Sequence, residues 1–360
     1  MTRALTCDVL ALIIEQLVGN KHRLFEISFL SKEIYSLVLP VLYRSNDFLD
    51  LAEALHFCNA ITHHSKSPGR FVHTLYLQVS FWGIPSSPIT PDPAVFEFIR
   101  SSLNLMPNLR ELSLFGFSLF SPMDLSGSPF KLKSLLISPP TDIHIAKFIS
   151  SQPTIVDLNI TSFTLTRQCV NIDHFIDPTM LPDLHTITGC PGLIASLAPG
   201  RPLTNVIIRP CHVHDSNKAD IIKYIASLDH TTAPIQSLHF DSDDRPEFSG
   251  WDFVECLKAT GIPLSLVCLT VKANLLDFAT QQAKNPSYLT EIAQVLQGFA
   301  CLQYFEVEEA VQGLIQEQLS AHEVIDMVFA VIERQANLKD LWRQNCPSLT
   351  SVKLFDKTIF

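Results

Sequence analysis

Apolar residues in the first part of the chain recur at the three- and four-residue spacing of amphipathic helices. They predict one helix over residues 5–17, a second over about 23–39 and a third over 50–64. Gly19 ends the first of these, and Pro40 interrupts the second. The chain therefore opens with a small group of helices.

From about residue 70 the pattern changes to short strands. A motif of three apolar residues, spaced apolar-x-x-apolar-x-apolar, occurs in ten frames separated by 19 to 47 residues. The frames begin at Val72, Leu109, Leu132, Ile155, Leu184, Leu203, Ile235, Leu266, Leu302 and Leu349. Several extend to the longer template L-x-x-L-x-L-x-x-N-x-L of leucine-rich repeats, and residues 266–276 match it at every position.

Most of the longer intervals between frames contain a predicted helix. These helices begin near Asp92, Asp142, Ile221, Ser249, Ile292 and Ser320. Alternating strands and helices predict an α/β fold, here an irregular leucine-rich-repeat solenoid (horseshoe) whose stacked units bury Leu, Ile and Val. Parallel strands would line its concave side. An ordinary α/β domain whose strands match the loose template is the alternative.

Composition and charge exclude several classes of protein. Hydrophobic residues make up 47% of the chain and charged residues 17%, so a large core is expected and global disorder is not. A net charge of -10 provides no long-range attraction for phosphate backbones, so we expect no nucleic-acid partner. The nine scattered cysteines form no Cys-x-x-Cys pair. Without an expected secretory signal or membrane span, they favour a cytoplasmic or nuclear location.

No motif for catalysis or metal binding is complete. His322-Glu323 begins like a zinc-protease helix, but Asp326 stands where the second histidine is needed. His212 and His214 have no nearby His or Cys pair to complete a tetrahedral site, and residues 241–244 lack the order of a calcium loop. We therefore expect no enzyme activity, no metal and no cofactor. An enzyme with an unrecognised α/β site is the alternative from another class.

The N-terminal helices carry a family resemblance. The relevant segments are Leu5-Thr6-Cys7-Asp8-Val9-Leu10, Ile13 to Leu17, Leu24, Ile27, Ser28 to Lys32 and Leu39 to Arg44. They resemble the F-box, a helical module that docks substrate receptors onto the Skp adaptor of cullin-RING ubiquitin ligases. Thr6 replaces the family's proline and Ile34 its tryptophan. An F-box followed by degenerate leucine-rich repeats is similar to the architecture of many fungal proteins.

This resemblance implies a division of the chain and a set of adaptor contacts. Residues 1–45 would be the F-box-like module, 46–69 a helical linker or N-terminal cap, and 70–360 the solenoid. The chain would be a non-catalytic substrate receptor that binds the Skp adaptor and, through it, cullin. The implied adaptor-binding residues are Leu5, Val9, Leu10, Ile13, Ile14, Leu17, Leu24, Leu30 and Lys32.

A second surface would hold the protein target for ubiquitin transfer. Side chains alternate along a strand, so residues between the template's apolar positions point to the concave side. The candidate target-binding residues are Asp157, Asn159, Arg209, His239, Asp241, Lys272, Tyr304, Glu306 and Glu308. The alternative function is a leucine-rich-repeat interaction scaffold with no ubiquitin role. Its first helices would fold as a cap against the strand at Val72, whereas a receptor would leave an apolar groove on them exposed.

Overall fold

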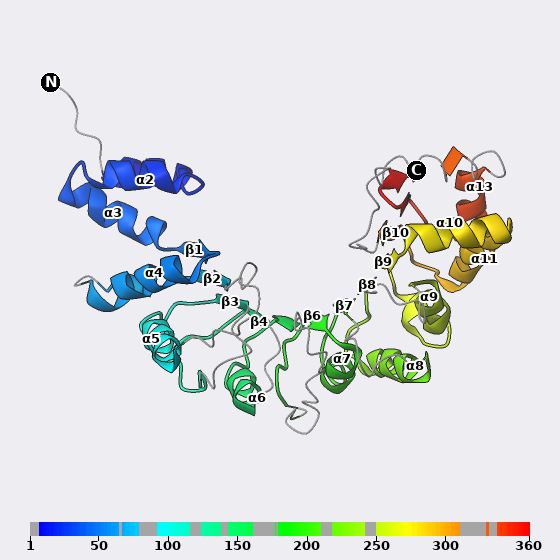
Figure 1. The fold of residues 1–360 in the computed structure, drawn as a ribbon, viewed down its shortest axis with the longest axis horizontal. Coiled ribbons are helices and arrows are strands. Elements are labelled where there is room, and N and C mark those ends of the chain that lie inside the picture. The colour runs from blue at the N-terminus through cyan, green and yellow to red at the C-terminus, as the bar shows by residue number, and fades with distance from the viewer. Residues whose placement is uncertain are drawn as a thin grey trace. The chain divides into compact units, whose positions relative to one another are not determined.

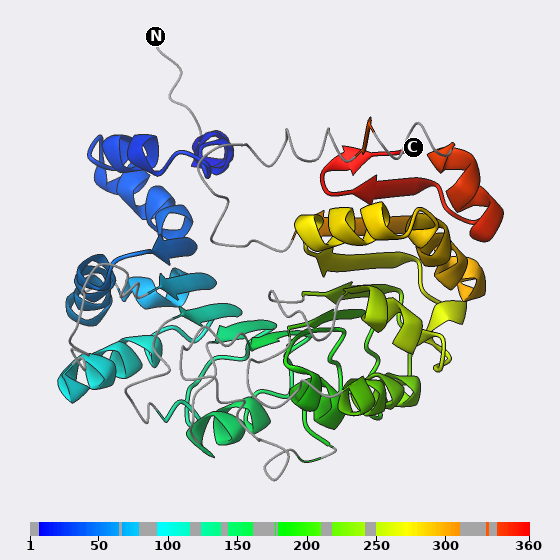
Figure 2. The same cartoon turned by 45° about the vertical axis from the view of Figure 1, so that its right-hand side comes forward.

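The computed structural model describes most of the chain in two compact units. The units are Met1–Asn159 and Ile160–Phe360. In each unit the strands follow chain order and helices lie along one side of them (Figure 1, Figure 2). The described residues are 7–64, 67–78, 92–115, 124–137, 143–160, 177, 179–209, 218–241, 250–309, 329–330 and 337–360.

The first unit opens with an N-terminal helical module of three helices. These are α1 (Cys7–Gln16), α2 (Lys21–Ser28) and α3 (Lys32–Leu42). The single helix predicted over 23–39 is wrong, because the chain breaks at Ser31, whose hydroxyl caps α3 by accepting the N–H of Ile34 at 3.1 Å. Pro40 does not interrupt the helix but lies inside α3.

Parallel strands alternate with helices in the rest of the first unit. Its elements are β1 (Ser45–Phe48), α4 (Leu51–His63), η1 (Pro68–Phe71), β2 (Thr74–Gln78), α5 (Pro93–Leu103), β3 (Glu111–Phe115), β4 (Ser134–Ile137), α6 (Ile143–Ser150) and β5 (Asp157–Ile160). Strands β1 to β4 pair in parallel, each with the next. The sheet therefore starts at Ser45, and β1 runs from the last residue of the predicted F-box-like module into the region expected to be a helical linker or cap.

The second unit repeats the same scheme. Its elements are β6 (Thr186–Gly189), α7 (Pro191–Leu197), β7 (Asn205–Ile208), α8 (Lys218–Ser227), η3 (Leu228–His230), β8 (Ser237–Phe240), α9 (Gly250–Leu257), η4 (Ile262–Leu264), β9 (Cys268–Ala273), α10 (Leu275–Lys284), α11 (Tyr288–Val295), η5 (Leu296–Gly298), β10 (Tyr304–Glu309), α13 (Leu338–Asn345), β11 (Ser351–Leu354) and β12 (Lys357–Thr358). Strands β6 to β11 are parallel, and β12 pairs antiparallel with β11. Helices α7, α10 and α13 were not predicted from the sequence. The helix predicted from Ser320 lies almost wholly outside the described residues.

All ten predicted frames form strands. Each strand begins two residues after the first residue of its frame, as Val72 precedes β2 and Leu349 precedes β11. The first residue of every frame is buried, with at most 3% of its surface exposed. The apolar positions of the frames therefore build the core that the repeat pattern predicts.

One backbone arrangement recurs between successive frames. The carbonyl of the second residue in a frame accepts two consecutive N–H groups from the next frame. The His73 carbonyl accepts those of Arg110 (2.8 Å) and Glu111 (3.0 Å), and the Thr204 carbonyl accepts those of Gln236 (2.9 Å) and Ser237 (3.0 Å). This pairing keeps neighbouring strands in step, so equivalent residues form rows across each sheet.

The two faces of each sheet differ in burial. In β8, Leu238 and Phe240 are buried toward the helices, whereas Ser237 and His239 lie partly exposed on the opposite side. The same alternation occurs in β4, β5, β7 and β11. We call the side away from the helices the open face.

Candidate functional site

The N-terminal helical module has its own core. Ile14, Leu24, Val38 and Val41 are buried against one another, and five partly buried apolar residues pack around them. The five residues packed around the core are Leu17, Ile27, Ile34, Leu37 and Leu42. Because all three helices contribute side chains to this core, the other apolar residues of the module lie outside it.

Exposed large apolar side chains are concentrated on this module. Among the described residues, twelve large hydrophobic side chains are exposed, and seven of them lie between residues 9 and 30. Phe29 and Leu30 are 72% and 71% exposed. Large apolar side chains exposed together on one small module favour an interaction surface. The seven, called here the apolar patch, are Val9, Leu12, Ile13, Val18, Phe25, Phe29 and Leu30.

The residues predicted to bind the adaptor divide by burial. Val9, Ile13 and Leu30 belong to the apolar patch and Lys32 is exposed, while Leu10 and Leu17 are partly buried. Ile14 and Leu24 are only 2% and 0% exposed. They shape the module from inside and do not reach its surface, so we remove these two from the predicted contact surface. Leu5 lies outside the described residues.

Four patch residues were missed by the sequence analysis. Leu12, Val18, Phe25 and Phe29 were not among the predicted adaptor contacts, although Phe29 lies in the F-box-like segment Ser28 to Lys32. The two phenylalanines stand four residues apart and meet edge to face, with ring centroids 4.8 Å apart and planes at 88°. An i, i+4 aromatic pair on one face of a short helix is a signal that could have identified them.

The module is tied to the start of the sheet by polar contacts. The Arg44 guanidinium donates two hydrogen bonds to the Glu15 carboxylate, at 2.8 and 3.1 Å. This contact, together with the attraction of the Arg44 charge, lowers the pKa of Glu15. Lys21 donates to the Ser45 carbonyl at the first residue of β1. These bonds fix α1 and α2 relative to the first strand of the unit.

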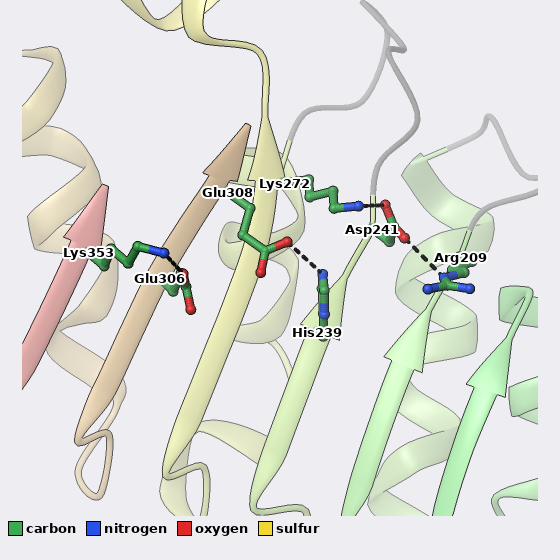
Figure 3. A network of polar contacts seen from close by, with 7 residues as sticks. All are labelled: Arg209, His239, Asp241, Lys272, Glu306, Glu308 and Lys353. Carbon is green, nitrogen blue, oxygen red and sulfur yellow. Dashed lines mark hydrogen bonds and ion pairs between the residues drawn. The ribbon is translucent and has the colours of Figure 1, made fainter. Parts of the chain in front are cut away.

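The open face of the second unit carries a row of alternating charge. Strand register places Asp241 beside Ile208, next to Arg209, and pairs Lys272 with Glu308. The row therefore runs Arg209, Asp241, Lys272, Glu308, alternating positive and negative (Figure 3). Residues of like charge are separated by an intervening strand, and residues of opposite charge lie on adjacent strands. This arrangement favours ion pairing across strands.

Asp241 is the centre of this row. Its carboxylate accepts from the Arg209 Nε at 3.0 Å through Oδ2 and contacts the Lys272 Nζ at 2.8 Å through Oδ1. The side chain is 11% exposed, whereas those of Arg209 and Lys272 are 39% and 24% exposed. A buried carboxylate held between two cations is fixed in position, and both cations keep an exposed part that a partner can contact.

His239 lies beside this row on β8, two residues before Asp241. Its Nε2 is 3.8 Å from a Glu308 carboxylate oxygen, and among the described residues this buried nitrogen has no hydrogen-bond partner. Burial lowers the pKa of His239, and the charges of Glu308 and Asp241 oppose that effect only in part. The imidazole is therefore neutral at pH 7.

A second ion pair lies toward the C-terminal end of the unit. The Lys353 ammonium donates to Glu306 at 2.8 Å and lies 3.0 Å from Asp356. These contacts raise the pKa of Lys353, the Glu306 hydrogen bond most of all. Tyr304, on the same strand as Glu306, is half exposed. Lys353 was missed in the sequence analysis, although its place in the Leu349 frame marks it as facing outward.

The remaining predicted target residues, Asp157 and Asn159, lie at the end of the first unit. Both are on the open face of β5. The Ser134 hydroxyl donates to Asp157 at 3.2 Å, while burial and the nearby Glu111 carboxylate raise the pKa of Asp157. The nine predicted residues therefore share the open-face orientation but belong to two separate units.

The described residues show no group of three or more His, Cys, Asp or Glu side chains that could hold a metal ion. The sequence segments considered for metal binding, 212–215 and 322–326, lie outside the described residues, as do residues 242–244. Within the part of the chain that the structure describes, no helix has both the length and the apolar character needed to cross a membrane.

No family model matches the chain, and no curated protein matches its sequence. Among solved structures, it is similar to the leucine-rich repeat-containing protein LegL7 from Legionella pneumophila. The identity is 14% and the TM-score 0.45, over 81% of this chain and 91% of that chain.

Proposed function

We propose that the chain is a non-catalytic substrate receptor of a Skp-cullin-F-box ubiquitin ligase. The N-terminal helical module binds the Skp adaptor, and the open face of the repeats binds a target protein. Ubiquitin transfer is performed by other subunits, so the receptor contributes by tethering, which raises the effective concentration of the target. The Skp adaptor is proposed as the partner because residues 2–45 resemble the F-box.

The apolar patch is the observation that carries this proposal. A helical cap that only sealed the repeats would turn Val9 and Ile13 against the first strands, but these side chains are 40% and 45% exposed. The module instead completes a core of its own and presents apolar helix surface outward. Docking of helices onto a partner uses such a surface, with the large aromatic and aliphatic side chains as anchors.

The open face of the second unit supports the target-binding half of the proposal. Its charged side chains are held in place by ion pairs with neighbouring strands, so little side-chain freedom is lost when a partner binds. Alternating charges select a partner with the complementary order and reject one with like charges in register.

The adaptor half is tested by binding of the purified full chain to a fungal Skp adaptor, beside a Val9→Asp/Ile13→Asp variant. Two charges in an apolar interface cost on the order of 3 kcal/mol or more, so affinity should fall at least about 100-fold. Circular dichroism checks that the variant keeps its helices.

A matched control places the same charges on exposed apolar residues elsewhere. Leu105→Asp/Leu264→Asp changes two exposed leucines outside the module, and it should bind the adaptor like the unaltered chain. If the folded, unaltered chain does not bind the adaptor, the ligase role is refuted and a repeat scaffold remains.

A further inference from the structure

A cleft opens on the helix-covered side of the second unit, between α9 and α11. Its space, including the part open to solvent, is ≈ 370 Å³. All of its lining residues come from these two short helices, so the cleft lies within one unit. The residues lining this α9–α11 cleft are Trp251, Val254, Glu255, Tyr288, Glu291, Ile292 and Val295.

The floor of the cleft is apolar and firmly held. Val254 and Ile292 are buried among the helices. The Trp251 ring packs against Phe278 and Phe305, with centroids 6.1 and 6.3 Å away. Because these aromatic contacts fix the indole, the floor is formed before any ligand arrives.

The rim of the cleft is anionic. Glu255 and Glu291 lie at its edge and are exposed. Burial, together with the charges of Asp252, Asp277, Glu291 and Glu255, raises the pKa of Tyr288 to about 12. Among the described residues, the charges that raise this pKa are carboxylates, which favour a cation at the mouth of the cleft.

The surrounding chain contributes few positive charges. The second unit contains 14 Lys and Arg residues against 23 Asp and Glu residues, a formal charge of -9. Lys258 directly follows α9, but its ammonium donates to the Gln294 carbonyl at 3.4 Å and it does not line the cleft.

We propose that the α9–α11 cleft binds a lysine or arginine side chain of a basic segment in a partner protein. The methylene stem packs on Val254 and Ile292, as such stems do on apolar surface. The cationic group lies between the aromatic rings of Trp251 and Tyr288 and the rim carboxylates, which attract it through the ring faces and through charge. This site goes beyond the proposed adaptor and open-face roles and does not depend on them.

The binding test uses short capped peptides, Gly-Gly-Lys-Gly-Gly and its arginine form, titrated into the isotopically labelled full chain at about 0.15 M salt. The indole N–H resonance of Trp251 reports the cleft, and that of the fully buried Trp342 is the internal reference. We expect a saturable shift of the Trp251 resonance alone. A peptide with norleucine in place of lysine keeps the stem without the charge and should produce no saturable shift.

Paired variants separate the local site from general attraction to an acidic chain. Glu255→Gln/Glu291→Gln should weaken peptide binding roughly three- to tenfold. The control Glu53→Gln/Glu97→Gln removes the same charge from exposed positions in the first unit and should leave binding within about twofold, since neither side chain lines the cleft and salt screens exposed charges.

Three outcomes would overturn the proposal: no saturable shift, an equal response to the norleucine peptide, or equal weakening in both double variants. Skp adaptor binding is measured on the same proteins. It should be unaffected by Glu255→Gln/Glu291→Gln, so failure of the cleft and failure of the adaptor role give different results.

Discussion

Arg201 is a buried cation, and its replacement gives the sharpest stability prediction. The side chain is 1% exposed, and within the part of the chain that the structure describes it donates to backbone carbonyls alone. Its guanidinium contacts the carbonyls of Met180 (2.8 Å), Leu197 (2.6 Å), Pro199 (3.0 Å) and Asp177 (3.2 Å). Leu197 is the last residue of α7, where carbonyls lack helical partners and the helix dipole favours a positive charge.

The magnitude follows from those four acceptors. Arg201→Met leaves four carbonyls without their donor, at about 1–3 kcal/mol for each one that stays buried and unpaired. Removing the buried charge offsets part of this loss of unfolding free energy, because burial disfavours the cation and lowers the pKa of Arg201. We expect a net loss of about 3–5 kcal/mol in the unfolding free energy of the second unit.

Urea unfolding followed by tryptophan fluorescence measures this loss, since Trp251 and Trp342 both lie in the second unit. A loss of about 4 kcal/mol lowers the midpoint by roughly 1.5 M if the urea slope is about 2.5 kcal/mol/M. The matched control Arg209→Met removes a half-exposed arginine from the same unit and should cost about 1 kcal/mol or less. If Arg201→Met unfolds within about 1 kcal/mol of the unaltered chain, the carbonyl-capping argument is refuted.

Three further predictions concern other sites of the second unit. Gly250→Ala should lower the urea midpoint, because its Cβ would lie 2.5 Å from the Lys272 carbonyl oxygen. In the control Gly192→Ala the Cβ meets nothing within 4 Å, so this variant should be neutral or stabilising. A Gly250→Ala variant as stable as the unaltered chain would contradict this prediction. The free energy of unfolding should fall as the pH drops below 6.5, the ordinary pKa of histidine. The unfolded chain takes up a proton there, whereas the lowered pKa of His239 delays proton uptake in the folded chain. Thermal unfolding of His239→Gln should show a shallower decline with falling pH, and an unchanged decline would exclude His239 as a cause. Asp241→Asn should lower the melting temperature more than Glu306→Gln, since Asp241 is buried between two cations and Glu306 is one-third exposed; the reverse order would contradict the assigned geometry.

The strands were predictable and several helices were not. The frame at Leu266 correctly places Leu269 and Val271 in the core, because strand residues alternate and the register follows from backbone bonds that recur between frames, although Thr270 between them is also buried. The missed helix α10 follows directly from the same frame. Asn274, taken as the template's asparagine, accepts the N–H of Asp277 in the first turn of that helix. Its role as a cap was visible in the sequence only as an asparagine before an apolar run.

The candidate surfaces were predictable in orientation but not in partnership. The outward direction of His239 and Glu308 follows from alternation, but their approach across an intervening strand depends on side-chain geometry. For the predicted adaptor-binding residues it was burial that could not be predicted. Ile14 and Leu24 match the F-box pattern, yet they fill the core of the module. Helical periodicity marks an apolar face without showing which part of it is covered. Arg201 gave no sequence signal at all, since its partners are backbone carbonyls.

Adaptor docking by the N-terminal helical module is tested most directly by hydrogen–deuterium exchange of the full chain, with and without a saturating Skp adaptor. The proposed function predicts slower exchange over α1 and α2, where the apolar patch lies, and unchanged exchange in strands β6 to β11. A complex that protects other regions and leaves α1 and α2 unchanged, or no complex at all, would contradict it.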